Sequence, residues 1–315
     1  PVASAILGVV FTLSFMYKDD NYTTEMRMVR SAGADKWGEV LDLYTQSPNR
    51  TISMVMLKNL ALMNEGGILD RSFEMGNDIV GIYNPDSVHV SFLEIASPVV
   101  YYNYGMFNEG FRLNFECGEQ TGFSPIYLKM LCRCALANGE MELVDRFITL
   151  LHGHPYYKDW QPAPVSEKIK ELYKSYKDEL TGVENSDSYI INSISLWYES
   201  DSKLASEQAL FFSMLRCDTR RFWPSLRHYL NLHQGEAFPV HAQEAYIMYY
   251  DKAPEEKKMK LPVSQEVFDN YNEFWATLEA LIKSGVNQND IPAKMRDEFG
   301  GTYWYYNVFG RKIAR

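Results

Sequence analysis

The sequence predicts an all-α protein whose first half is built from repeated helix pairs and whose second half continues as a C-terminal helical region. Apolar residues recur at steps of three and four along most of the chain, which is the period of a helix. No stretch shows sustained alternation of apolar and polar residues between hairpin turns, the pattern typical of strands. Glycines and prolines return at intervals of about 37 residues, which indicates a repeated structural unit.

Composition narrows the class of protein further. The 315 residues include 31 basic and 41 acidic side chains, for a formal net charge of −10, and no block rich in Lys or Arg. Such an acidic chain is not expected to bind the phosphate backbone of a nucleic acid. Four cysteines are too few for a disulfide scaffold, and 46% hydrophobic residues are too many for a disordered chain. We therefore expect a folded protein with no nucleic-acid partner.

Residues 1–17 contain no charged side chain, and Lys18, Asp19 and Asp20 end this apolar run. As a helix the run would be roughly 25 Å long, slightly less than the hydrocarbon core of a bilayer at about 30 Å. We interpret it as a truncated transmembrane helix that attaches the protein to a membrane. A buried core helix is the alternative. A secretory signal is disfavoured because no basic segment precedes the run and no small-residue cleavage site follows it.

The region 18–157 is predicted to form the repeated helix pairs. The stretch 60–73 aligns without gaps on the stretch 134–147, two units along the chain, with matching Ala, Leu, Asn and Phe residues. Because Gly frees the backbone at a helix end and Pro cannot continue a helix, each unit is expected to contain two helices joined by a Gly turn and closed by a Pro turn. The marker residues are Gly33, Gly67, Gly105 and Gly139, with Pro48, Pro85 and Pro155.

One apolar stripe within this region predicts a helix over about 99–118. Its members recur at steps of four and three, as expected for one face of a helix. The stripe consists of Val100, Tyr104, Phe107, Phe111 and Phe115. We interpret it as core packing and not as a cofactor site.

The second half begins with a charged amphipathic helix and an exposed turn over 158–187, followed by a C-terminal helical region over 188–315. Ser264 is a candidate N-cap for the clearest helix, and Gly285 is expected to end it. The helices expected in the C-terminal region are 189–199, 203–216, 219–233, 239–251, 264–284 and 292–300.

The helix pairs resemble tetratricopeptide repeats, although no unit carries the full consensus. This resemblance implies a right-handed solenoid with a concave groove for a peptide or partner segment. The spacings do not assign the groove residues.

Three further motifs lie at 189–193, at 235–245 (Gly-Glu-Ala-Phe-Pro running into Gln-Glu-Ala) and at 301–306 (Gly-Thr-Tyr-Trp-Tyr-Tyr). With the repeats, they resemble the C-terminal half of an uncharacterised bacterial membrane-protein family, a domain of unknown function. That resemblance implies a block of membrane helices before a soluble, tetratricopeptide-like region, and a place at the bacterial cytoplasmic membrane. It implies no catalytic residues.

Few residues in the chain suggest catalytic or metal chemistry. Cys132 and Cys134 lie two residues apart, on different faces of a helix, and are interpreted as buried apolar residues and not as ligands. His152 and His154 form the one close histidine pair; we interpret them as caps at a helix end, with metal binding as the alternative. First-turn carboxylates such as Asp70 are expected to complement helix dipoles. We therefore expect neither a metal nor a cofactor.

The candidate interaction surface is the run of four aromatic residues Tyr303, Trp304, Tyr305 and Tyr306. Four consecutive aromatic side chains cannot all point into one helix seam, so one or two are expected to be partly exposed. They could cap the end of the helical stack, or they could contact a membrane interface, a partner or a glycan.

We expect a membrane-tethered helical-repeat domain that binds a protein or peptide partner and has no catalytic activity of its own. The alternative is an accessory or substrate-positioning domain of a multi-span membrane enzyme that acts on a saccharide or a lipid-linked substrate. An independent helical hydrolase or lyase would need a pocket of convergent acids that the sequence does not reveal. The oligomeric state and the side of the membrane are left open.

Overall fold

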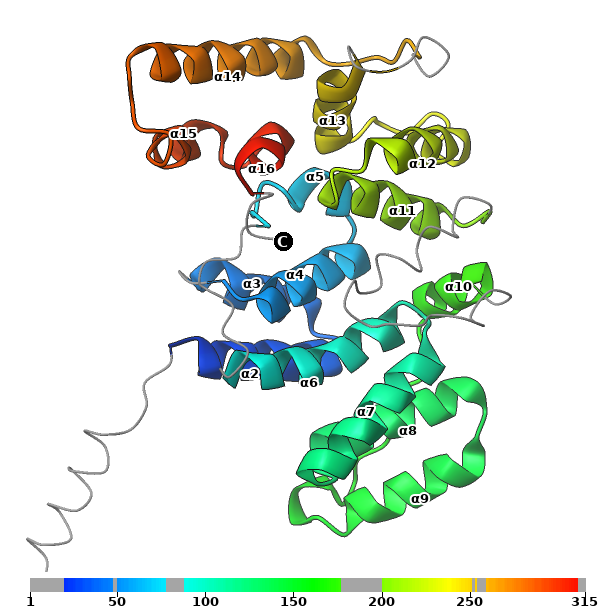
Figure 1. Cartoon of the computed structure of the whole chain (residues 1–315). Coiled ribbons are helices and arrows are strands. Elements are labelled where there is room, and N and C mark those ends of the chain that lie inside the picture. Colours follow the sequence, from blue (N-terminus) through cyan, green and yellow to red (C-terminus); the bar gives the residue numbers. More distant parts are fainter. Residues whose placement is uncertain are drawn as a thin grey trace, which may run out of the picture.

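The computed structural model describes residues 20–47, 50–77, 88–176, 200–250, 253 and 259–310. Within these ranges the regular elements are all helices, so the predicted all-α class is confirmed (Figure 1). The predicted helix 189–199, the turn near 182–188, and the marker residues Pro48 and Pro85 lie outside the described residues.

The first half of the chain forms a series of helices joined by short turns. Neighbours in sequence pack together from α2 to α4 and from α6 to α9, and α6 also packs on both α2 and α4. The helices are α2 (Asp20–Gly33), α3 (Trp37–Gln46), α4 (Ile52–Glu65), α5 (Ile68–Arg71), α6 (Val88–Asn103), α7 (Phe107–Thr121), α8 (Pro125–Asn138) and α9 (Met141–His152).

The second half confirms five of the predicted helices to within one residue at each end. A short 3₁₀ turn, Pro155–Tyr157, precedes them. The helices are α10 (Glu167–Tyr176), α11 (Lys203–Leu215), α12 (Thr219–Leu232), α13 (Val240–Tyr250), α14 (Gln265–Lys283), α15 (Ile291–Phe299) and α16 (Tyr303–Phe309). Ser264 accepts a hydrogen bond from the Val267 backbone N–H at 3.3 Å, which confirms it as the N-cap of α14.

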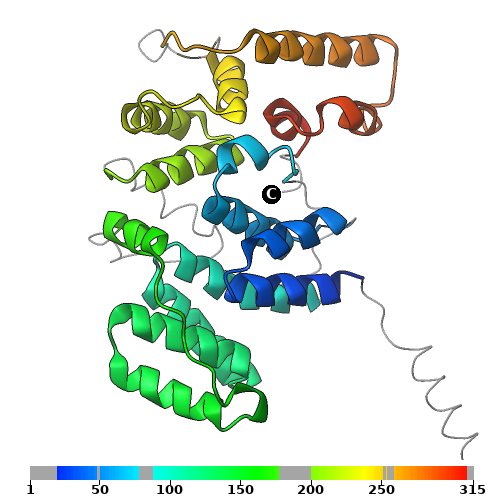
Figure 2. The same ribbon diagram turned by 180° about the vertical axis from the view of Figure 1, so that it is seen from behind.

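The helices form an elongated stack that does not follow the order of the sequence (Figures 1 and 2). Helices α2 to α5 lie in the middle, and α7 to α9 extend the stack to one end. The chain then returns through α10, and α11 to α16 build the opposite end on the short helix α5, which contacts both α11 and α13. Segments far apart in sequence therefore meet around α5.

Glycines mark the helix junctions as predicted. Gly33 is the last residue of α2, and Gly67 and Gly139 lie at helix ends with positive φ. Gly105 separates α6 from α7 with a φ of 77°, so the single helix expected over 99–118 is wrong. The two backbone N–H groups at this corner donate to the last turn of α6 instead of continuing the helix.

The unit after Gly67 also differs from the expectation. Helix α5 has four residues, where a full second helix is expected. The following turn is held from outside, because Arg50 donates to the Met75 carbonyl at 2.8 Å and the Tyr44 hydroxyl donates to the Gly76 carbonyl at 2.7 Å. The structure thus shows helical hairpins, while a regular tetratricopeptide-type repeat remains a prediction.

None of the helices in the described ranges combines the length and the apolar character needed to cross a bilayer. The apolar run 1–17 lies outside these ranges. The predicted transmembrane helix is therefore not tested by the structure.

Gly105 offers a direct test of how α10 docks on the first half. A Cβ atom on Gly105 would lie 2.7 Å from the backbone N of Tyr173 in α10, whereas a Cβ on Gly139 would meet no atom within 4 Å. Both glycines have positive φ, so an L side chain at either position would be strained.

We predict that Gly139→Ala lowers the free energy of unfolding by about 1 kcal/mol and that Gly105→Ala lowers it by about 2–4 kcal/mol. Urea unfolding followed by circular dichroism measures both. Equal losses in the two variants would contradict the close approach of α10.

Candidate functional site

The four aromatic residues of the predicted interaction surface form the first turn of α16, and all four are buried. Their exposed fractions are 0% for Tyr303 and Trp304, 2% for Tyr305 and 6% for Tyr306. Tyr303 and Tyr306 belong to the main core, and Trp304 and Tyr305 to a second cluster with α14 and α15. Helix α16 lies between the main core and the cluster formed with α14 and α15, so rings that point in different directions are all buried. The expected exposure is wrong, and these residues do not form a surface.

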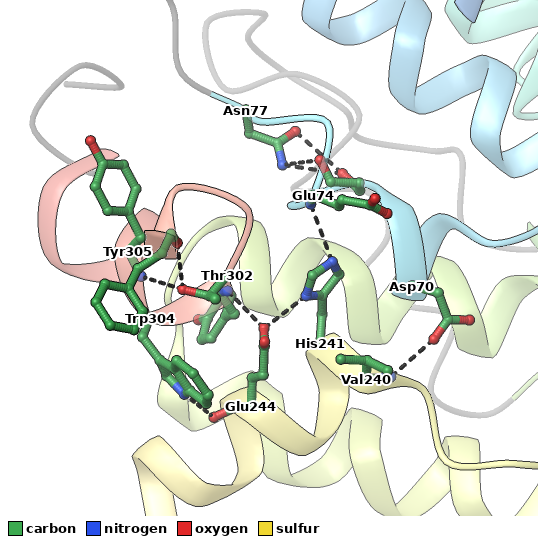
Figure 3. Close-up of polar contacts among 12 residues, drawn as sticks. Asp70, Glu74, Asn77, Val240, His241, Glu244, Thr302, Trp304 and Tyr305 are labelled. Atoms are coloured by element: carbon green, nitrogen blue, oxygen red, sulfur yellow. Dashed lines mark hydrogen bonds and ion pairs between the residues drawn. The ribbon is translucent and has the colours of Figure 1, made fainter. Parts of the chain in front are cut away.

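Glu244 of α13 holds the start of α16 in place (Figure 3). Its Oε2 accepts a hydrogen bond from the Tyr303 backbone N–H at 2.7 Å, and its backbone carbonyl accepts one from Trp304 Nε1 at 3.0 Å. The first N–H groups of a helix have no partner within the helix, and they carry its positive partial charge. A carboxylate only 5% exposed is stabilised at this position.

His241 links the same carboxylate to the segment after α5 (Figure 3). The Glu74 backbone N–H donates to His241 Nε2 at 3.2 Å, so Nε2 is the unprotonated nitrogen. The proton therefore lies on Nδ1, which donates to Glu244 Oε2 at 2.7 Å. Asp70 reinforces the junction, because its Oδ1 accepts from the Val240 backbone N–H at 2.9 Å. Asp70 thus complements the N-terminus of α13 as well as that of its own helix.

The motifs at 235–245 and 301–306 therefore meet each other and the α5 segment. Gln243, also in the first of these motifs, donates to the Phe238 carbonyl at 2.6 Å and accepts from the Ser264 backbone N–H at 2.8 Å. The hydrogen bonds of Glu244, His241 and Gln243 described above connect helix ends to neighbouring segments. Their role in this structure is to assemble the fold.

Ser206, His233 and Glu236 form an arrangement that resembles a catalytic triad. His233 Nδ1 lies 2.6 Å from Glu236 Oε2, and Nε2 lies 3.1 Å from Ser206 Oγ. The Ser206 hydroxyl, however, donates to the Lys203 carbonyl at 2.7 Å and is fully buried. Because this hydroxyl is inaccessible to solvent, it cannot reach a substrate as a nucleophile would. The arrangement ties α11 to the end of α12.

The other sequence candidates are also structural. Burial raises the pKa of Cys132 to about 11 and that of Cys134 to about 12. His152 Nε2 bonds the Trp160 carbonyl at 3.0 Å, and His154 Nδ1 accepts from the Tyr156 backbone N–H at the 3₁₀ turn. Both histidines fix the chain after α9, so they cap this loop and not the last carbonyls of α9.

A pocket of about 920 Å³ lies between α2 and α8. Helices α6 and α7 and the segment 154–163 complete its walls. Its apolar lining consists of Met26, Val29, Ile95, Val99, Ile126 and Met130. We call it the α2–α8 pocket. Its volume lies at the upper end of the range of ligand sites.

The α2–α8 pocket is positively charged. Arg30, Lys129 and Arg133 line it, and Asp35 is the one carboxylate among its lining residues. Arg133 is 4% exposed and donates to both carboxylate oxygens of Asp35, at 3.0 and 3.1 Å. It also donates to the Gly33 carbonyl at 2.9 Å, and its guanidinium lies 4.5 Å from the centre of the Tyr102 ring. Arg133 therefore fixes α8 to the end of α2.

The ammonium group of Lys129 lies against an aromatic wall of the pocket. Its Nζ lies 3.8 Å from the centre of the Tyr157 ring and 6.0 Å from that of Trp160, within reach of cation–π attraction. Burial lowers the pKa of Lys129, and the nearby Arg30 charge lowers it further. The pocket thus holds two neighbouring cations beside an aromatic wall.

No motif in the sequence marks this pocket. A signal was nevertheless present in α8, whose two charged residues, Lys129 and Arg133, interrupt an apolar helix at a spacing of four. What assembles the pocket is the packing of α6 across α2, which the spacing of residues does not reveal.

The described part of the chain is thus an all-helical structure with a cationic and aromatic pocket. The chain belongs to a family of unknown function (DUF6057), whose model matches residues 2–310. The prediction of an uncharacterised family is therefore confirmed, while its membrane helices and tetratricopeptide character remain predictions. No curated protein and no solved structure matches the chain.

The Glu244 junction can be tested by a neutral substitution. We predict that Glu244→Gln lowers the free energy of unfolding by about 1.5–3 kcal/mol, because hydrogen bonds to a buried charged acceptor are lost. The exposed Glu273→Gln in α14 is the matched control and should change it by less than about 0.5 kcal/mol. Urea titration measures both, and similar losses would contradict the role of Glu244.

Cysteine reactivity tests the burial of α8. At pH 8 the thiols of Cys132 and Cys134 are protonated, because this pH lies below their raised pKa values of about 11 and 12. We predict that iodoacetamide modifies the half-exposed Cys117 in the native protein and leaves these two thiols unmodified until urea is added. Mass spectrometry of tryptic peptides measures the labelling. Native labelling of Cys134 as fast as that of Cys117 would contradict the structure.

Proposed function

We propose that this protein is a non-catalytic helical module that binds an extended peptide segment of a partner protein in the α2–α8 pocket. The observation that carries the proposal is the pocket itself, which combines an apolar lining with cations and aromatic rings. Such a mixture of apolar surface and a few polar groups is typical of a recognition site.

The chemistry of the lining favours binding over catalysis. Hydrolysis by general acid and base needs two groups with opposite roles near one reacting atom. The one carboxylate of the lining, Asp35, is engaged by Arg133 at 3.0 Å. The pocket residues thus offer surface complementarity and charge without a paired acid and base.

The proposal includes the finer predictions made from the sequence. We propose that the hairpins follow a tetratricopeptide-type solenoid, which the glycine junctions after α2, α6 and α8 support. We also propose that residues 1–17 tether the protein to the bacterial cytoplasmic membrane. That part rests on the apolar character of the segment alone.

One observation favours a second candidate function. Tyr127, Tyr157 and Trp160 line the pocket, and flat amphipathic rings are suited to stacking on a sugar. The protein would then position a saccharide or a lipid-linked saccharide for a membrane enzyme.

A peptide-display selection against the described chain tests the proposed function. Ala163 is exposed at the rim of the pocket, so Ala163→Trp should obstruct it without disturbing the core. Ala280 is exposed on α14, far from the pocket, and Ala280→Trp is the matched control. We expect selected peptides to bind the wild type and the control equally, and to bind Ala163→Trp at least about tenfold more weakly, as measured by calorimetry.

Each outcome decides between the candidates. Failure to select any peptide, or peptides whose affinity is unchanged by Ala163→Trp, would overturn peptide binding in this pocket. Binding of soluble oligosaccharides that Ala163→Trp abolishes would replace it with the saccharide function.

A further inference from the structure

We propose that the α2–α8 pocket selects acidic peptides, with carboxylate side chains of the bound segment held between Arg30 and Lys129. This inference rests on the proposed function and adds the chemical class of the partner.

Arg30 and Lys129 have no acidic partner among the described residues. Within the described ranges neither Arg30 nor Lys129 forms an ion pair or a hydrogen bond. The nearest candidate, Asp35, is already bound by Arg133 through both of its oxygens. Two charged donors therefore face the pocket without an acceptor from the pocket lining.

The fold holds the like charges of Arg30 and Lys129 near each other. Lys129 comes from the middle of α8 and lies over the Tyr157 ring, while Arg30 comes from the last turn of α2. The Arg133 contacts to Gly33 and Asp35 keep the two helices in register. A carboxylate placed between the cations would relieve their repulsion without requiring either helix to move.

The charge of the pocket lining has the opposite sign to the net charge of the chain. The formal net charge is −10, yet the pocket lining contains three cations and one carboxylate. An acidic segment is therefore attracted to the pocket lining although the protein as a whole carries a negative net charge. Charge complementarity of this kind steers a partner and sets its orientation.

The apolar lining argues for a peptide over a small anion. A free ion would use the cations but leave the surface of Val29, Val99 and Met130 uncovered. A segment that alternates apolar and acidic residues covers both. The bound partner is therefore expected to contain Asp or Glu beside aliphatic side chains.

The test uses two end-capped octapeptides, one alternating Leu and Glu and the other alternating Leu and Gln, measured by calorimetry against the folded chain. We expect the Glu peptide to bind at least about tenfold more tightly at low salt, and less so at high salt. Arg30→Gln and Lys129→Gln should each weaken its binding by about three- to tenfold. Arg27→Gln removes the same charge one turn earlier in α2, where Arg27 faces Glu39, and should have little effect.

The failures are distinguishable. Equal affinity for the Glu and Gln peptides, or for the wild type and both pocket variants, overturns the acidic selectivity and leaves peptide binding intact. Displacement of the Glu peptide by inorganic phosphate at equal concentration also overturns it, since the cations would then form a phosphate site. Display selection that yields no peptide overturns the proposed function as well. Circular dichroism of each variant verifies that it is folded.

Discussion

One buried carboxylate connects the two halves of the described chain. Glu244 receives the first N–H of α16 and, through His241, is connected to the backbone after α5. A buried charge is tolerated only when donors surround it, so the contacts among α5, α13 and α16 support one another. This requirement explains why helices from the two halves of the chain meet in the middle of the stack.

Polar groups play different roles at the Glu244 junction and at the α2–α8 pocket. Around Glu244 the donors and acceptors are matched, and the result is a closed core. In the pocket, Arg133 donates hydrogen bonds to Asp35 and to the Gly33 carbonyl. Arg30 and Lys129 line the same pocket without an acidic partner among the described residues. A protein holds like charges side by side at some cost in stability. That cost is understandable where a ligand supplies the missing charge.

Much of the fold could be predicted from local pattern. Five of the helices after residue 200, α11 to α15, were predicted to within one residue at each end, whereas α16 was not predicted. The break at Gly105 was missed because the apolar stripe continues through it. The burial of Tyr303–Tyr306 was missed because it depends on helices on both sides of α16. The pocket, likewise, depends on α6 crossing α2, a long-range contact with no local signature.

The place of Phe73 has a consequence for how the chain matures. Its ring packs against Tyr303 and Tyr306 with centroid distances of 5.0 and 5.1 Å. Because Tyr303 and Tyr306 lie far along the sequence from Phe73, this contact forms only after the intervening helices have been synthesised. Ordinary repeat arrays can fold progressively from one neighbour to the next. Here the central layer is complete only when α16 has been added, so the packing around α5 depends on contacts that are distant in sequence.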